Sequence, residues 1–543
     1  MREGPASRKF AEVVLGALLL VSGRAWAGDW LTFGHDPHRT GWVRGEHALN
    51  VEDAGQIALL WQVQLKNKAL SLTALTAPLV ATNVTTAQGV RTLVYVAGSS
   101  DNVFAVDAAT GSLVWSVSFA TYSRPKYPSM WLCPEGLNAT PTVDQDSAVI
   151  YVLAADGRLY GLDLGSGRTK LGPIPFVPPY SKVWSLNLIH GVIYTTISQG
   201  CAGTPSGIYA ADVRNPARPV IRELLTGGLS AGIWGRGGVT VGADDRIYAS
   251  VGDGATNPQA GLYGSSVIAV DTSDLKVEDY FTPHDHDTLN RLDQDLGSST
   301  PAWFESGRRH LLAMGGKGGT LYLLDADRLG GADHETPLQT LRLSNDERAY
   351  EENGIWGGFA TSRDEDGVVW VYVPVWGPIS KEVPRFRVTH GADPNGSLMA
   401  FTVKYTGADT GTDASSPEPQ LEPQWVSRDF NRPEPPVVGN GVVFGLATGE
   451  NPQQTLGSRV VTSPGHFGKR GLTDRERMEH TTHAVLYALD ARTGKTLYSS
   501  RDAIRGWVHF SGLAIANGRI YVVDHDSRLY CFGLKKSIRT EKR

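Results

Sequence analysis

A short phrase recurs along the whole chain, and this self-similarity constrains the fold more than any other feature of the sequence. Each copy has an apolar stretch with a Tyr, a turn of the Asp-Gly type, and a second apolar stretch that ends in Asp. Several copies continue with Thr-Gly and a Trp. We recognise eight copies, which cover residues 94–115, 150–167, 192–212, 247–271, 310–325, 369–401, 442–495 and 520–532.

The pattern within each copy predicts short strands joined by tight turns. Apolar and polar positions alternate with a period of two, as in a half-buried strand. The Asp-Gly pair suits a hairpin turn, and the Asp of Asp-x-x-Thr-Gly bonds backbone N–H groups of a second turn. The chain also combines 62 Gly and 30 Pro with 14 Trp and 19 Tyr, which favours strands and turns over helices. Such units cannot bury both faces alone, so we predict an all-β fold, an eight-bladed β-propeller.

The end of the repeat predicts how the ring closes. The eighth copy stops at Leu534, soon after its third strand. We therefore predict that residues 59–63, near the N-terminus, supply its missing strand. Residues 28–543 are predicted to form this single propeller domain, with polar insertions at 377–394 and 409–423.

The first 27 residues have the pattern of a signal peptide. Arg2, Arg8 and Lys9 precede an apolar stretch at 13–21, and Ala25-Trp26-Ala27 is a small-x-small cleavage site. We expect a periplasmic or secreted protein; a retained amphipathic helix is the alternative. No later segment reaches the ~20 apolar residues of a membrane span.

Charge and cysteine content narrow the partners and the compartment. The net charge is -5, without a basic stretch, which argues against a nucleic-acid partner. In an oxidising compartment Cys133 and Cys201 are able to form a disulfide, and the sequence leaves this pairing open. Cys531 has apolar neighbours in a strand and is expected to be a buried, inert thiol.

The repeat resembles that of a known family. The phrase Tyr-Val-x-x-x-Asp-Gly-x-Leu-Tyr-Ala-Leu-Asp-x-x-Thr-Gly-x-x-x-Trp, best seen at 94–115 and 486–498, resembles the repeat of the quinoprotein β-propellers. The opening segment at 29–36 and Arg39-Thr40-Gly41 are also similar to that family. Its members include alcohol dehydrogenases that depend on pyrroloquinoline quinone (PQQ) and non-catalytic scaffolds of the outer-membrane assembly type. The resemblance implies a quinoprotein-like propeller and leaves both activities open.

The resemblance implies three cofactor-binding residues. Trp234, within Gly-Ile-Trp-Gly, stands where the dehydrogenases place the Trp under the quinone. Lys317, within Gly-Gly-Lys-Gly-Gly, matches the segment whose Lys or Arg contacts the quinone oxygens. Arg236 is a further candidate for a cofactor carboxylate. The implied cofactors are PQQ and Ca²⁺.

The resemblance also implies the metal ligands and the base. Asp253 takes the position of the family's calcium-binding Asn, where a carboxylate suits a hard cation equally well. Leu292-Asp293-Gln294-Asp295 resembles the family's Trp-Asp-x-Asp, so Asp293 becomes the catalytic base and a metal ligand. Asp295 is the alternative base.

Two features depart from the family pattern. A metal-binding Glu is expected near residues 199–202, where this chain has Gln-Gly-Cys-Ala. The adjacent cysteine pair of many alcohol dehydrogenases is absent. A site that lacks one carboxylate should bind a hard cation less tightly.

Structural explanations compete with each functional one. Trp234 is equally explained as a core aromatic, and Asp293 and Asp295 as turn or cap residues. Lys317 is explained as an ordinary exposed lysine. The segment 283–287, Pro-His-Asp-His-Asp, has side chains that suit a transition metal, but it is more typical of a solvated loop.

Two functions remain. The first is an exported quinoprotein-type oxidoreductase that oxidises an alcohol or sugar hydroxyl. It needs a separate electron acceptor, because the sequence contains no Cys-x-x-Cys-His for c-type haem. The second is a non-catalytic propeller that binds a protein or polysaccharide partner in the cell envelope.

Overall fold

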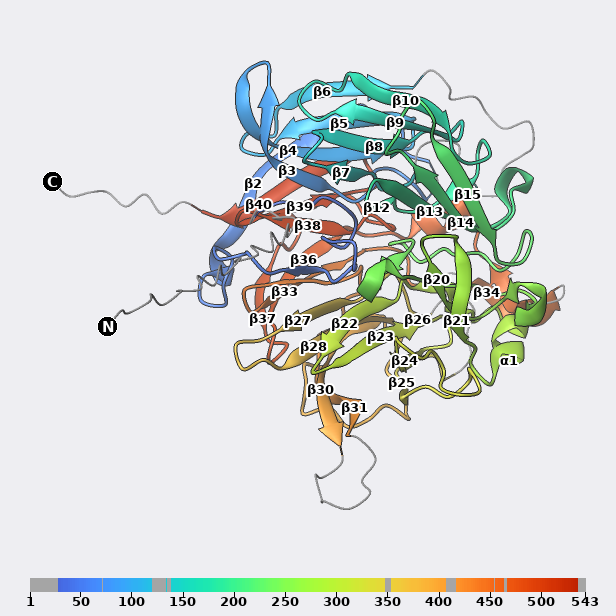
Figure 1. Cartoon of the computed structure of the whole chain (residues 1–543). Coiled ribbons are helices and arrows are strands. Elements are labelled where there is room, and N and C mark those ends of the chain that lie inside the picture. Colours follow the sequence, from blue (N-terminus) through green and yellow to red (C-terminus); the bar gives the residue numbers. More distant parts are fainter. Residues whose placement is uncertain are drawn as a thin grey trace, which may run out of the picture.

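The computed structural model describes residues 28–70, 72–119, 133, 138–346, 353–406, 417–453, 455–462 and 466–535. The predicted signal peptide therefore lies outside the described residues. The described chain is nearly all β and forms eight blades arranged as a β-propeller (Figure 1). This confirms the predicted fold class.

Four blades are four-stranded antiparallel sheets whose strands follow one another along the chain. We number the blades in chain order. Blade 1 comprises β3 (Leu79–Thr86), β4 (Gly89–Gly98), β5 (Asn102–Asp107) and β6 (Leu113–Ser118); blade 2, β7 (Thr142–Asp144), β8 (Val149–Leu153), β9 (Arg158–Asp163) and β10 (Thr169–Pro175); blade 4, β16 (Thr240–Val241), β17 (Ile247–Ser250), β20 (Val267–Asp271) and β21 (Lys276–Phe281); blade 5, β22 (Ala302–Ser306), β23 (Arg309–Gly315), β24 (Thr320–Asp325) and β25 (Gln339–Arg342).

Three further blades carry additional short strands. Blade 3 comprises β11 (Lys182–Val183), β12 (Asn187–Ile189), β13 (Val192–Ser198), β14 (Gly207–Asp212) and β15 (Val220–Leu225); blade 6, β26 (Gly354–Ile355), β27 (Ala360–Arg363), β28 (Val369–Trp376), β29 (Val388–Thr389), β30 (Gly396–Thr406) and β31 (Glu418–Val426); blade 7, β1 (Trp42–Val43), β32 (Val437–Gly439), β33 (Val442–Ala447), β36 (Val485–Asp490) and β37 (Thr496–Ser499).

Hairpins and short helices are inserted between the blade strands. They are β18 (Thr256–Asn257) with β19 (Leu262–Tyr263), β34 (Thr455–Thr462) with β35 (His466–Gly471), α1 (His286–Arg291), α2 (Asp474–Glu479) and the 3₁₀ turns η1 (Ala54–Gln56), η2 (Cys201–Gly203), η3 (Ala243–Asp245), η4 (Pro258–Ala260) and η5 (Leu296–Ser298). No helix of the described chain is long and apolar enough to cross a membrane.

Blade 8 joins the two ends of the described chain. It combines β38 (Leu513–Ala516), β39 (Arg519–Val523) and β40 (Arg528–Leu534) with β2 (Ile57–Gln64). In Figure 1 the blue β2 lies beside the red β40, and Leu59 stands opposite Phe532 in the antiparallel ladder. The prediction that residues 59–63 close the ring is confirmed.

The Thr-Gly and Trp of the repeat connect neighbouring blades. The Trp115 Nε1 of blade 1 donates to the Leu164 carbonyl oxygen of blade 2 at 2.8 Å. Its ring lies so close to Gly167 that a Cβ there would approach it to 2.7 Å. The same arrangement joins Trp61 to Ala108 and Gly111, and Trp425 to Ala491 and Gly494. The motif therefore docks the outer strand of one blade on a turn of the next.

The N-terminal segment before β2 contacts several blades. The Arg39 guanidinium, 4% exposed, donates to the carbonyl oxygens of Phe33, Leu186 and Val239. It thereby ties the segment to the chain around blades 3 and 4.

The predicted insertion at 409–423 is wrong at its end, because residues 418–423 belong to β31; residues 409–416 lie outside the described residues. Residues 418–423 instead pair with β30 in the sheet of blade 6. Cys133 and Cys201 form a disulfide, and Cys531 is a buried free thiol as predicted.

Candidate functional site

A cavity of about 390 Å³ lies where the loops of many blades meet. Its walls come from segments as distant in sequence as Phe33 and Phe510, so the closed ring creates it. All six residues singled out in the sequence line it: Trp234, Arg236, Asp253, Asp293, Asp295 and Lys317.

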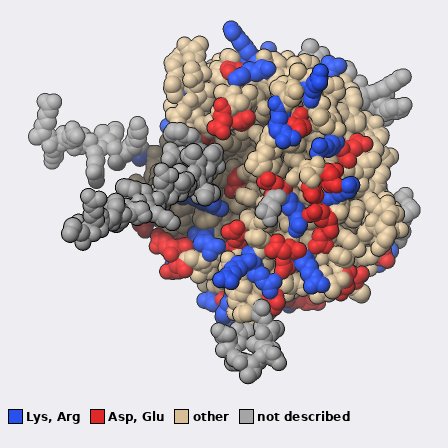
Figure 2. All heavy atoms as spheres, viewed as in Figure 1, with Lys and Arg blue, Asp and Glu red and all other residues tan. Residues whose placement is uncertain are grey.

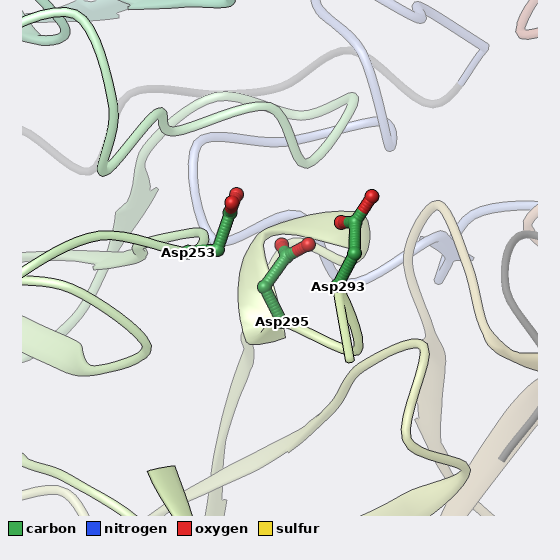
Figure 3. A group of neighbouring side chains, drawn as sticks. All are labelled: Asp253, Asp293 and Asp295. Carbon is green, nitrogen blue, oxygen red and sulfur yellow. The ribbon is translucent and has the colours of Figure 1, made fainter. Parts of the chain in front are cut away.

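Three carboxylates gather on one side of this cavity. Asp253, Asp293 and Asp295, which we call the acidic group, each offer an oxygen within 4.8 Å of the others. In Figure 3 their carboxylates lie side by side and point to the same side, Asp253 from one loop and the other two from the segment after α1. Among the described residues, this is the set of His, Cys, Asp and Glu side chains with the geometry to hold a metal ion.

The local fold explains how two of these carboxylates are placed. Helix α1 ends at Arg291, and Asp293 then adopts a left-handed conformation with φ of +52°. Such a conformation suits a turn, and Asp adopts it more readily than most residues other than glycine. Asp295 caps η5, and its Oδ1 accepts a hydrogen bond from the Gly297 N–H at 2.8 Å. The predicted capping role of Asp295 is thus real, and it coexists with a place in the cavity wall.

Lys317 connects the acidic group to the aromatic wall. Its Nζ lies 2.7 Å from Asp293 Oδ1 and 3.1 Å from Asp295 Oδ2. The same Nζ lies 4.9 Å from the centre of the Trp234 ring, whose Nε1 donates to Asp295 Oδ1 at 3.1 Å. With only 6% exposure, Lys317 is not an ordinary exposed lysine.

The glycines around Lys317 allow this close approach. Lys317 lies in the turn between β23 and β24, and its N–H donates to the Asp295 carbonyl oxygen at 3.1 Å. A Cβ at Gly316 would come within 2.4 Å of that carbonyl oxygen. Only glycine at this position lets the two loops touch.

Electrostatics favour the protonated form of Asp293. Burial raises its pKa well above the usual range, and the negative charges of Asp295 and Asp253 raise it further. The ammonium of Lys317 opposes this rise. The carboxylate of Asp293 is therefore more basic than an ordinary surface aspartate.

Four tryptophans form the aromatic wall, which the sequence reasoning found only in part. Trp184, Trp234, Trp356 and Trp376 pack in one cluster. Trp356 stacks on Trp376 at 4.5 Å between ring centres and meets Trp234 edge-on at 5.4 Å. The sequence held a signal for Trp356, because Gly-Ile-Trp-Gly occurs at both 232–235 and 354–357. Trp234 is thus both a packed aromatic and a cavity residue.

The remaining charged residues of the cavity are mostly paired with buried carboxylates. Arg236 forms an ion pair with Glu434, and its guanidinium lies 3.8 Å from the centre of the Phe510 ring. Arg477 and His509 lie 2.8 and 3.0 Å from the two oxygens of Glu450. Sequence reasoning missed Glu434 and Glu450, because only the closed ring brings them beside these partners.

The expected weakness of the metal site is offset by another residue. Gln199 lines the cavity where the family pattern has a Glu, so no carboxylate comes from that segment. Asp295, predicted only as a base, supplies a third carboxylate instead. Three carboxylates form a donor set that suits a hard cation.

The histidine-bearing segment at 283–287 does not join the cavity lining. His284 is 92% exposed and pairs with Glu335 at 2.8 Å. These features agree with the solvated loop that we predicted.

Comparisons with known proteins bear on the fold. Residues 49–194 match the family model described as outer membrane protein assembly factor BamB. A quinohemoprotein alcohol dehydrogenase from Comamonas testosteroni is 15% identical with a TM-score of 0.56, over 93% of this chain and 80% of that one. A related enzyme from Pseudomonas putida HK5 is 13% identical, with a TM-score of 0.55 over 94% and 80%.

A europium-containing methanol dehydrogenase is 12% identical, with a TM-score of 0.57 over 94% of this chain and 99% of that one. No curated protein matches the sequence significantly. At these identities the likeness concerns the fold, which is that of the PQQ-type β-propellers.

Proposed function

We propose that this PQQ-type β-propeller is an exported oxidoreductase that oxidises an alcohol or sugar hydroxyl. Its cofactor is PQQ, with a hard cation such as Ca²⁺ at the acidic group. The observation that carries the proposal is the meeting of Trp234, Lys317 and the acidic group in one cavity. In the sequence these residues are spread over more than eighty positions.

The cavity fits such ligands in size and chemistry. Its volume of about 390 Å³ lies within the range of small-molecule sites. The tryptophan cluster offers apolar surface for a planar ring system, and the acidic group offers only oxygen donors. The europium named for one structural neighbour extends the candidate cations to trivalent ones.

The residues of this chain have separable roles in the proposed reaction. PQQ held against Trp234 would supply the two-electron acceptor, and a cation held by the acidic group would supply a Lewis acid. Asp293 takes the hydroxyl proton on its carboxylate, which lies in the cavity wall beside Lys317. Lys317 orients Asp293 through the 2.7 Å contact, and Asp295 fixes the Trp234 ring through Nε1.

Export is supported by the signal-like N-terminus and by the disulfide. The bond between Cys133 and Cys201 is typical of a protein in an oxidising compartment. Cellular fractionation of the full-length chain would test this part of the proposal.

The decisive experiment compares two aspartates that are close in sequence. Dye reduction with alcohols and sugars is measured after loading with PQQ and Ca²⁺ or Eu³⁺. We expect Asp293→Asn to lower kcat by roughly 100-fold or more, since general-base catalysis contributes about that much. Asp287→Asn, on α1 with a 94% exposed side chain, is the matched control and should keep wild-type activity.

Binding is measured separately from turnover. Saturable quenching of tryptophan fluorescence by PQQ, weakened in Trp234→Ala, is the expected result. If the wild-type protein shows neither quenching nor dye reduction, the enzymatic proposal fails.

A second candidate function is a protein-binding scaffold of the cell envelope. The match of residues 49–194 to the assembly-factor model favours it. This function requires no cofactor, so it predicts a protein that captures an envelope partner equally well in Asp293→Asn.

A further inference from the structure

Lys182 differs from the other cations of the cavity. Arg236, Lys317 and Arg477 each lie beside carboxylates of this chain. Within the described residues, Lys182 lines the same cavity without an ion pair or a hydrogen bond from its Nζ. Lys182 is partly exposed in the cavity wall, so its ammonium is open to an anionic group of a ligand that enters the cavity.

The position of Lys182 is fixed by its surroundings. It lies in β11, opposite Ser198 of β13, and its Nζ lies 5.2 Å from the centre of the Trp184 ring. The Trp184 Nε1 donates to Ser198 Oγ at 2.8 Å, which holds the ring beneath the ammonium. Burial lowers the pKa of Lys182 to about 8, so at neutral pH it is still mostly a cation.

A second polar group without a partner lies nearby. In the described part of the chain, neither side-chain amide atom of Asn138 has a hydrogen-bond partner, although both atoms are buried. Asn138 lines the cavity, and it also lines a small adjoining pocket with Ser181 and Val183, the two neighbours of Lys182. A buried amide without a partner is uncommon and calls for an explanation such as a missing ligand.

We propose that Lys182 and Asn138 form a subsite that binds a carboxylate of the cavity's ligand. The ammonium and the amide NH₂ both donate hydrogen bonds, and a carboxylate accepts from both. One cation balances one negative charge, which suits a carboxylate better than a phosphate dianion. The assignment of this carboxylate to a substrate, a hydroxy acid or sugar acid, rests on the proposed function.

The carboxylate has two possible sources, the substrate and the quinone cofactor. Isothermal titration calorimetry with D-gluconate and its neutral counterpart D-glucitol tests the subsite without turnover. We expect wild-type protein to bind gluconate about tenfold or more tightly than glucitol, as hydrogen bonds to charged groups contribute that much. Lys182→Met should remove this preference and leave glucitol binding unchanged, whereas Lys182→Arg should retain it.

Controls separate the subsite from general charge effects. Lys170→Met removes a lysine whose Nζ donates to the Ser147 carbonyl oxygen at the surface, and it should keep the preference. Asn138→Ala should weaken gluconate binding by a smaller factor. If Lys182→Met does not fold, Lys182→Gln carries the same expectation.

Repeating the titration with saturating PQQ identifies the source. A preference that persists assigns the subsite to the substrate; one that is lost, with PQQ affinity lowered in Lys182→Met, assigns it to the cofactor. Equal affinity of wild type for both probes, or an undiminished preference in Lys182→Met, overturns the proposal. The calorimetric assay needs no catalysis. If the protein does not bind PQQ, the enzyme proposal fails, but the gluconate and glucitol affinities still test the subsite.

Discussion

Arg236 illustrates what its surroundings do to a single residue. The sequence suggested a cation for a cofactor carboxylate, but the guanidinium is 4% exposed and paired with Glu434, 198 residues away. Glu434 also accepts from the Phe510 and Gly512 N–H groups. Glu434, in the loop before blade 7, thus connects Arg236 in the loop before blade 4 to the loop before blade 8.

Removing one partner should show how strongly the pair depends on both charges. We expect Arg236→Met to lower the free energy of unfolding by about 3–5 kcal/mol, because it leaves Glu434 buried without its cation. Chemical denaturation measures the loss. Arg236→Met combined with Glu434→Gln should recover part of it, since Gln still accepts the backbone hydrogen bonds; a double variant no more stable than the single one would contradict this reasoning.

Asp36 should make stability depend on pH in the acid range. Burial would raise its pKa, but hydrogen bonds and the charge of His35, together with Thr40, outweigh burial and lower the pKa to about 2. Thr40 donates its N–H to Asp36 Oδ1 at 3.0 Å. A depressed carboxyl pKa stabilises the folded state above the unfolded pKa of about 4, and this contribution is lost as pH falls from about 4 to 2.

Asp36→Asn should therefore be less stable than wild type by about 2 kcal/mol at pH 7. The difference should shrink toward pH 2. Thermal unfolding at several pH values measures it, and a difference that stays constant with pH would show that the charge of Asp36 is not the cause.

At the scale of elements, the Trp–Gly contacts explain why the repeat contains Thr-Gly. Gly111 has φ of +75°, and a Cβ there would approach the Trp61 ring to 2.7 Å. Trp61 belongs to β2, so this contact joins the closing strand of blade 8 to blade 1. Glycine is needed at such a position for two reasons: the backbone is left-handed, and an aromatic ring leaves no room for a Cβ.

Two alanine substitutions can separate the effect of backbone strain from that of the contact with the aromatic ring. Gly261 has φ of +73° and no atom within 4 Å of its Cβ position, so Gly261→Ala tests backbone strain alone. We expect about 1 kcal/mol of destabilisation there and about 2–4 kcal/mol in Gly111→Ala, where overpacking adds to strain. Equal losses in the two variants would show that the Trp61 contact contributes nothing to the stability of the turn.

At the scale of the whole molecule, the ring protects its interior from solvent. Cys531 lies in β40 between the other strands of blade 8 and is fully buried. Burial raises the pKa of its thiol to about 11. Acidic and basic side chains are interspersed over the face shown in Figure 2, so this face offers mixed charge rather than a field of one sign.

Thiol titration reports this protection directly. The native protein should react with no thiol reagent, because Cys531 is buried and the other two cysteines form a disulfide. Denaturation should expose one thiol, and denaturation with reduction should expose all three cysteines. Rapid labelling of the native protein would mean that blade 8 opens easily or that the disulfide is absent.

The sequence by itself determined the blade architecture. Its eight copies, the turn residues in each, and the closing strand at 59–63 are local patterns, and the spacing of apolar residues is enough to reveal them. The resemblance of Trp234, Asp293 and Lys317 to family motifs also came from short segments. Each of these motifs lies within a few consecutive residues, so it can be recognised without knowing which distant residues lie nearby.

Tertiary structure alone decided which side chains meet. Asp295 joins Asp253 in the acidic group, Glu434 neutralises Arg236, and Lys182 is left facing the cavity without a carboxylate of the described chain. These outcomes depend on contacts between segments that are distant in sequence, such as the loops that hold Arg236 and Glu434. Burial inside that ring then sets the charge state of each group, which no local pattern in the sequence can specify.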